Sequence, residues 1–233
     1  MRNILLLVSL SAALAHDAWA QSSCSSDGQA TPLTLVERFI SADCEACWSA
    51  PQTIKPSARA LSLDWIVPSA QGEAAPLAAA ANPDARLRLE TLGRAAPTES
   101  FVTSSKLVAG RAATLRVAHG VPVGGYIGAS VELKTTSRAF QPGPLSVWLA
   151  LVETIPAGTE GTTYARNLVR NVLLPTWNKP DVLLKTEQRV FRETRSLSIP
   201  PGASYARLRV VGWVQDTHGR VRTAAQSVCA PPA

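Results

Sequence analysis

The placement of four cysteines constrains the fold of this chain more than any other feature. Cys44 and Cys47 form a C-x-x-C, whereas Cys24 and Cys229 lie near opposite ends of the chain. If the C-x-x-C pair bonds internally, Cys24 and Cys229 remain as partners, and chain ends often lie close together on a domain surface. We therefore expect a structural disulfide between Cys24 and Cys229, with an intermolecular bond or a free thiol as the alternatives.

The first twenty residues have the pattern of a secretory signal peptide. Arg2 precedes an apolar run that is shorter than the roughly 20 residues needed to span a bilayer, and Ala18-Trp19-Ala20 resembles a cleavage site. We expect residues 1–20 to be removed and the remainder to be periplasmic or secreted, where disulfides persist. The alternative is an uncleaved anchor. No later stretch is apolar enough to span, so stable membrane insertion is not expected.

The net charge of +6 lies entirely in the second half of the chain. Residues 21–120 hold 9 Lys or Arg and 9 Asp or Glu, whereas residues 121–233 hold 13 and 7. Arg207 and Arg209 alternate with apolar residues, which is typical of the solvated face of a strand. Because no basic run with interleaved aromatic residues is present, a nucleic-acid partner is not expected.

The first half of the chain has an α/β pattern, which we assign to residues 31–111. Residues 33–41 are largely apolar on both faces, as in a strand that is buried on both sides of a sheet, and residues 60–67 read as a second strand that Pro68 ends. A short helix is expected within 47–60. A second is expected from the Asn82-Pro83 cap to Gly93, and a small hairpin within 101–108.

The second half, residues 112–233, reads instead as an antiparallel β-sandwich. Pro-rich and Gly-rich turns separate seven short runs of strand-forming residues, without a good helix between them. These runs are 114–117, 126–133, 145–153, 165–174, 189–199, 204–215 and 221–229. The predicted fold class is therefore α+β, an α/β domain followed by a sandwich.

The C-x-x-C follows an apolar strand and opens a predicted helix. A helix N-terminus stabilises a thiolate, so Cys44 is the candidate nucleophile and Cys47 the thiol that resolves a mixed disulfide. The alternatives are an inert structural disulfide and half of a zinc site. A zinc site would need His119 and His218, which we interpret as turn residues, so we predict neither a metal nor another cofactor.

Three segments resemble a family of uncharacterised secreted bacterial proteins in the thioredoxin-like superfamily. Residues 36–47, VERFISADCEAC, are similar to its V-E-L-F-T-S-x-G-C-x-x-C motif, departing at Arg38, Ile40 and Asp43. Residues 164–170, followed by Trp177, resemble its Y-R-N-V-V-R…W stretch. Residues 210–216, followed by Ala224-Ala225, resemble the last two sandwich strands of this family and of a related outer-membrane lipoprotein family. The resemblance implies a trimmed thioredoxin-like domain over 31–111, followed by the sandwich.

The same resemblance suggests further site residues. Thioredoxin-like enzymes place a cis-proline beside the active disulfide, and Pro97 is the nearest candidate, an ordinary trans proline being the alternative. Trp48 stands where the family usually has proline. We take Pro97 and Trp48 as candidate substrate-binding residues. Glu37 corresponds to the buried acid that relays a proton to the resolving thiol, although it could equally be a strand-edge residue paired with a surface arginine.

These features predict an exported thiol–disulfide protein that acts on protein thiols or disulfides through Cys44 and Cys47. The rival hypothesis is a non-catalytic periplasmic binding or scaffold protein with a vestigial thioredoxin fold. A copper(I) carrier that uses the two thiolates is a third reading. Nothing in the sequence indicates an oligomeric state.

Overall fold

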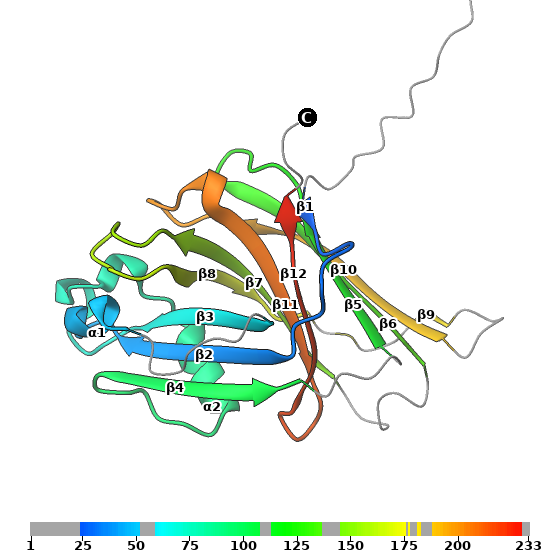
Figure 1. Cartoon of the computed structure of the whole chain (residues 1–233), viewed down its shortest axis with the longest axis horizontal. Helices are drawn as coiled ribbons and strands as arrows, with labels where there is room; N and C mark the ends of the chain where they lie inside the picture. Colours follow the sequence, from blue (N-terminus) through cyan, green and yellow to red (C-terminus); the bar gives the residue numbers. More distant parts are fainter. Residues whose placement is uncertain are drawn as a thin grey trace, which may run out of the picture.

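Two β-sheets form the main body of the described part of the protein (Figure 1). The computed structural model describes residues 24–51, 59–107, 113–136, 145–175, 177, 181–182 and 188–229. In the described chain, the larger sheet has seven strands in the order β12-β11-β7-β8-β3-β2-β4, and the smaller has six in the order β13-β1-β5-β6-β10-β9. The described residues also form two short α-helices and three 3-10 turns.

Strands that are consecutive in the sequence are distributed between the two sheets. They are β1 (Cys24–Ser25), β2 (Thr34–Ser41), β3 (Ala60–Val67), β4 (Ser100–Lys106), β5 (Ala113–His119), β6 (Tyr126–Thr136), β7 (Ser146–Ile155), β8 (Arg166–Leu173), β9 (Asp181–Val182), β10 (Gln188–Ser198), β11 (Leu208–Gln215), β12 (Val221–Gln226) and β13 (Val228–Cys229). The helices are α1 (Glu45–Ser49) and α2 (Asp84–Thr91), and the 3-10 turns are η1 (Gly72–Ala74), η2 (Ala78–Ala80) and η3 (Tyr205–Arg207).

The seven-stranded sheet combines strands from both halves of the chain. Strand β2 runs parallel to β3 and antiparallel to β4, which is one continuous strand and not the expected hairpin. Strand β3 runs parallel to β8, and their register has a single pair, Asp64 opposite Leu168. Strands β7, β11 and β12 continue the sheet in antiparallel fashion.

The predicted fold class is therefore wrong. The described chain is mostly β, and its early strands form one edge of a large sheet that later strands complete, so it is not a thioredoxin α/β fold followed by a sandwich. The apolar pattern of the early strands predicts that both of their faces are covered, which is typical of an α/β layer but is not specific to it. Periodicity reports that a face is buried, but it does not report which element covers it.

Apolar side chains fill both faces of the seven-stranded sheet. On one face, a cluster that includes Phe39, Trp65, Trp148 and Trp213 packs beneath α2. On the other face, β7 and β11 pack against β5 and β6 of the six-stranded sheet. The same face, at the end occupied by α1, carries a smaller cluster that includes Trp48. Strand β7 is buried almost throughout because it contributes to both faces.

Helix α2 begins and ends where its sequence signals place it. The side-chain oxygen of Asn82 accepts a hydrogen bond from the Asp84 N–H at 2.9 Å, which satisfies one of the free donors of the first turn. Gly93, with a φ of +64°, follows the last turn, a conformation that favours glycine. The expected helix is thus confirmed, and it covers the Trp-rich face of the sheet.

Cys24 and Cys229 are joined in the expected disulfide. They lie opposite each other on the neighbouring strands β1 and β13 of the six-stranded sheet. Cys24 is buried, whereas Cys229 is exposed. The bond therefore fixes the first described strand to the last one within a single sheet.

Replacing Cys24 and Cys229 together by serine should lower the free energy of unfolding by about 2–5 kcal/mol. The bond joins residues 205 positions apart, and long closed loops restrict the unfolded chain most. Urea unfolding followed by tryptophan fluorescence measures the change. The matched control is the Cys44→Ser/Cys47→Ser variant, whose bond spans only three positions. Equal losses in the two variants would contradict the loop-length argument.

Candidate functional site

The Cys44–Cys47 disulfide lies where β2 ends and α1 begins. Both cysteines are partly exposed. Cys44 caps α1, and its Sγ accepts a hydrogen bond from the Cys47 N–H at 3.3 Å. Cys47 packs against the apolar cluster around Trp48. The disulfide is therefore accessible to solvent and to a partner molecule, while the Cys47 side chain is held by apolar packing.

Two buried arginines hold the backbone of α1 in place. The Arg38 guanidinium, from β2, donates to the carbonyl oxygen of Cys47 and, at 3.4 Å, to that of Ala50. Arg166, the first residue of β8, donates to the carbonyl oxygen of Trp48 at 2.8 Å and also to that of Ala50. These carbonyl groups at the end of a helix have no partner within it. The two guanidinium groups therefore supply the hydrogen-bond donors that the N–H groups of a further helical turn would otherwise provide.

Asp64 supplies the negative charge between these arginines. It lies opposite Arg38 in the register of β2 and β3, and it is completely buried. Its Oδ2 accepts a hydrogen bond from the Asn167 N–H at 2.9 Å, and its Oδ1 lies 3.9 Å from Nη1 of Arg166. Burial raises the pKa of the Asp64 carboxyl and lowers the pKa values of Arg38 and Arg166.

The resulting cluster beneath α1 has two guanidinium groups and one carboxyl group. Arginine stays protonated in proteins, so the cluster carries at least one uncompensated positive charge. Positive charge near a cysteine favours the thiolate form, which is the reactive form. The exposed carboxyl groups of Asp43 and Glu45 flank Cys44 and act in the opposite direction.

Trp48 is buried at the inner side of α1 and borders a cavity of about 260 Å³. Its indole N–H donates to the carbonyl oxygen of Glu160 at 2.7 Å. The cavity is mainly apolar, with Glu160 and Arg170 as its charged residues. Its lining residues are Trp48, Ile66, Pro76, Leu77, Ala79, Ala80, Glu160, Leu168, Arg170, Pro201 and Gly202. This volume is below the roughly 300–1,000 Å³ of sites for drug-sized ligands, so it suits a single side chain.

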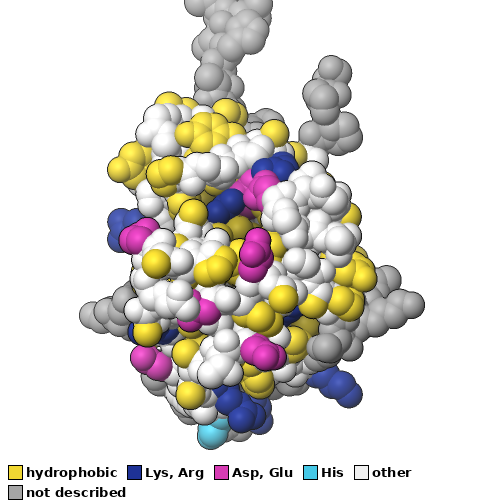
Figure 2. Space-filling view, turned by 90° about the vertical axis from the view of Figure 1, so that its left-hand side faces the viewer, with side chains coloured by type: hydrophobic (Ala, Val, Ile, Leu, Met, Phe, Trp, Pro, Cys, Tyr) yellow, Lys and Arg dark blue, Asp and Glu magenta, His cyan; other side chains and the backbone are white. Residues whose placement is uncertain are grey.

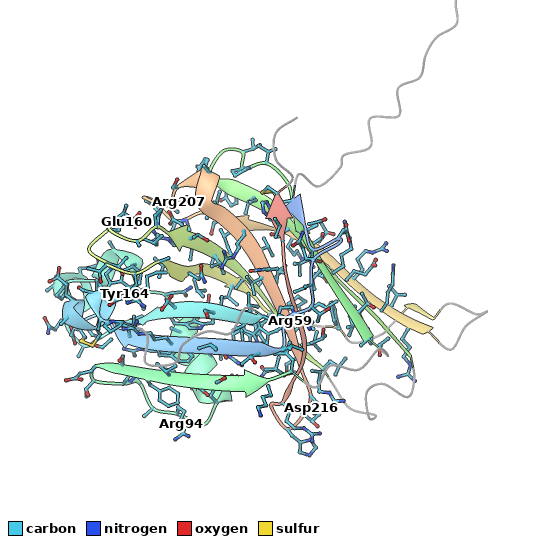
Figure 3. The ribbon with its side chains drawn as sticks, viewed as in Figure 1. Arg59, Arg94, Glu160, Tyr164, Arg207 and Asp216 are labelled. Carbon is cyan, nitrogen blue, oxygen red and sulfur yellow. A yellow bond between two sulfur atoms is a disulfide. The ribbon has the colours of Figure 1, made fainter. Side chains whose placement is uncertain are left out.

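An ion-pair network holds the loop that carries Glu160. Figure 3 shows the side chains of Glu160 and Arg207 lying close together, and these two residues form an ion pair. Arg207 also pairs with the buried Glu153, which in turn pairs with Arg170 at 2.7 Å. Glu160 has a φ of +47°, which is uncommon for a residue other than glycine. The network thus fixes the loop against Trp48.

Glu37 does not lie with the cysteines. Neighbouring residues of a strand point to opposite faces, and Arg38 occupies the face that carries α1. The fully buried Glu37 instead binds Arg88 of α2 through two hydrogen bonds of 2.6 and 2.8 Å. Arg88 also lies against the rings of Trp148 and Trp213, at 5.1 and 5.3 Å from their centroids. The expectation of an unpaired acid near Cys47 is thus not met, because a cation neutralises Glu37 on the far face.

Pro97 lies in the loop between α2 and β4, close to the end of β2 in the sheet register. All peptide bonds among the described residues are trans, including the bond before Pro97. Pro97 is therefore the ordinary trans proline of the alternative, and not a cis-proline. The loop that contains Pro97 is joined to the end of β2 by a backbone hydrogen bond, which the Ser41 N–H donates to the Glu99 carbonyl oxygen at 2.8 Å.

Sequence reasoning missed Asp64 and Arg166 as members of the site. Asp64 interrupts an otherwise apolar strand, and an ionisable residue in such a run is itself a signal of a buried, paired charge. Arg166 lies in a segment that the family resemblance had singled out, but nothing in the sequence relates that segment to residues 44–50. Only the pairing of β3 with β8 brings it there.

Glu37→Gln should lower the free energy of unfolding by about 3–5 kcal/mol, because it leaves the Arg88 charge buried without its partner. The rate of the predicted thiol–disulfide exchange should stay unchanged in the folded protein, since Glu37 lies on the face opposite α1. Urea unfolding and stopped-flow exchange kinetics measure the two effects. The exposed Glu90→Gln on α2 is the matched control, with a change within about 0.5 kcal/mol. A slower exchange in Glu37→Gln would return this residue to the mechanism.

After mild reduction, Cys44 should react with iodoacetamide faster than Cys47. The Cys47 N–H points at the Cys44 sulfur and stabilises its thiolate, whereas Cys47 packs against the apolar cluster beneath α1. Mass spectrometry of peptides taken at short times gives both rates. Equal rates, or faster labelling of Cys47, would contradict the assignment of Cys44 as the nucleophile.

Comparison with known proteins gives a likeness of fold alone. No protein-family model matches the sequence, and no curated protein matches it. The structure is similar to that of HBP35 of Porphyromonas gingivalis, with a TM-score of 0.52 and 10% sequence identity, over 87% of this chain and 81% of that chain. The similarity extends over most of both chains, so it concerns the combined two-sheet arrangement.

Proposed function

We propose that this protein exchanges disulfides with protein thiols through Cys44 and Cys47. The observation that carries the proposal is a partly exposed disulfide on a five-residue helix whose carbonyl groups are held by two buried arginines. A purely structural bond between residues three positions apart contributes little by loop closure. The hydrogen bonds from Arg38 of β2 and Arg166 of β8 instead hold the backbone of α1, and with it the two sulfur atoms, in one geometry that suits exchange.

The exchange needs no cofactor and balances in two steps. In the reduced protein, the Cys44 thiolate attacks a partner disulfide, which forms a mixed disulfide and releases one partner thiolate. The Cys47 thiolate then attacks the Cys44 sulfur, which re-forms the Cys44–Cys47 bond and releases the second partner thiolate. Two electrons pass to the partner, and the reverse sequence oxidises a partner dithiol.

The surroundings of the disulfide favour a peptide as partner. Figure 2 shows the end of the molecule that carries α1, where hydrophobic and acidic side chains are interspersed. The cavity beside Trp48 has room for one apolar side chain of a peptide. The exposed Asp43 and Glu45 favour a basic residue near the partner cysteine.

The site belongs to a chain that we propose is exported to an oxidising compartment. Two disulfides are present and leave no free cysteine among the described residues, which is compatible with such a compartment. Over the ranges that the structure describes, none of the helices has the length and apolar character required to cross a membrane.

The test is reduction of insulin by a dithiol in the presence of the purified protein. We expect faster insulin precipitation than with the dithiol alone, and loss of that acceleration in Cys44→Ser. Cys47→Ser should accumulate a mixed disulfide through Cys44, visible on non-reducing gels, because the resolving thiol is absent. The Cys24→Ser/Cys229→Ser variant is the matched control and should keep the activity. No acceleration and no mixed disulfide would reject exchange and favour the scaffold hypothesis.

A further inference from the structure

The six-stranded sheet places a histidine beside the second disulfide. Cys24 of β1 lies opposite Cys229 of β13 on one side and opposite His119 of β5 on the other. Residues directly opposite one another on antiparallel neighbours project from the same face. A sulfur of each cysteine and a ring nitrogen of His119 lie within 4.8 Å of one another. His119 is therefore the last residue of a strand and part of a cluster, whereas the sequence suggested a turn.

One nitrogen of His119 is free to act as a ligand. The Nδ1 atom lies 2.9 Å from the carbonyl oxygen of Gly120, which can only accept, so Nδ1 carries the proton and Nε2 a lone pair. Nε2 is buried and has no hydrogen-bond partner in the described part of the chain, in a residue that is 4% exposed. Burial also lowers the pKa of His119, which favours the neutral, metal-binding form of the ring.

We infer that reduction of the Cys24–Cys229 bond creates a zinc site formed by the two cysteine sulfurs and Nε2 of His119. Two thiolates and an imidazole are a common zinc ligand set. With Zn–S near 2.3 Å and Zn–N near 2.0–2.1 Å, tetrahedral ligands stand roughly 3.5–3.8 Å apart. Both cysteine sulfurs and one ring nitrogen of His119 already lie within 4.8 Å of one another, so zinc binding through Nε2 requires a local adjustment of the ring and of the sulfurs.

The local structure allows that adjustment. Cys229 ends a two-residue strand at the edge of the sheet and is exposed, whereas Cys24 and His119 are buried. Separation of the two sulfur atoms can thus be taken up by β13 while β1 and β5 stay in place. The exposed side also leaves the fourth zinc position open to water.

The chemistry requires a reductant, which we specify as a dithiol. The dithiol gives two electrons and two protons to the Cys24–Cys229 bond and becomes a disulfide itself. The two thiols then release two protons as Zn²⁺ binds their thiolates, while neutral His119 contributes only its lone pair. Exchange with a disulfide, which accepts the two electrons and takes up two protons to become a dithiol, re-forms the Cys24–Cys229 bond and releases Zn²⁺, so disulfide and zinc exclude each other.

Zinc titration of the Cys44→Ser/Cys47→Ser protein tests this inference without interference from the other pair. The protein is reduced with a dithiol, freed of it without oxygen, and titrated with Zn²⁺ against a chromogenic chelator. We expect one zinc per reduced chain and none per oxidised chain. Cobalt(II) in place of zinc should give thiolate-to-cobalt charge-transfer absorption. Binding of copper(I) without binding of zinc would overturn the assignment.

His119→Gln in the same background should weaken zinc binding at least about tenfold, as expected for loss of a ligand or its support. The matched control is His218→Gln, which alters an exposed histidine in the turn between β11 and β12 and should leave the affinity unchanged. Unchanged affinity in His119→Gln would exclude this residue as a ligand.

Circular dichroism establishes whether the reduced protein keeps its fold. Zinc should raise the thermal unfolding midpoint of the reduced protein and leave that of the oxidised protein unchanged, because a ligand stabilises only the state that binds it. A reduced protein that loses its fold, and does not regain it with zinc, would overturn the inference.

Discussion

The buried charges around Asp64 are the constraint on which the rest of the molecule depends. Strands β3 and β8 share a single register pair, so the two parts of the seven-stranded sheet have little backbone ladder between them. The Asp64 carboxylate compensates by accepting the Asn167 N–H and by facing Arg166. Removing one member of a buried ion pair leaves a charge with neither water nor partner, which is strongly destabilising. The buried charges therefore allow only the observed pairing of β3 with β8.

The same charges connect the fold to the Cys44–Cys47 disulfide. Arg166 belongs to β8, yet it binds carbonyl groups of α1, more than 110 positions earlier in the chain. Trp48 and Ser49 make further contacts with the loop before β8, through Glu160 and Thr163. A five-residue helix has too few internal hydrogen bonds to be stable alone. Its conformation, and hence the geometry of the Cys44–Cys47 bond, is thus imposed by the later half of the chain.

Adjacent residues of β2 anchor its two faces in the same way. Arg38 faces α1 and Asp64, whereas Glu37 faces Arg88 and the stacked rings of Trp148 and Trp213. Arg88 also donates to Gln215 of β11 at 2.7 Å, so this pair too depends on a later strand. Both networks bury charges that are stable only when the whole sheet is assembled. This interdependence explains why the early strands do not form a separate α/β layer.

The sequence by itself determined those features that depend on neighbours along the chain. The apolar runs located β2 and β3, Asn82 and Gly93 bounded α2, and the cysteine spacing indicated both disulfides. Each rests on local propensity, capping or the count of possible partners, which a linear pattern contains.

Only the tertiary structure decided which element covers each buried face and which distant residues meet. It placed Glu37 on the face of the sheet away from the cysteines, Arg166 against the backbone of α1, and His119 beside Cys24. Strand periodicity specifies that two faces alternate, but register and strand order arise from pairings between strands, and those of β1 with β5 and of β3 with β8 join residues more than 90 positions apart. Those pairings are chosen by the energy of the assembled core and its buried charges, which no local pattern contains.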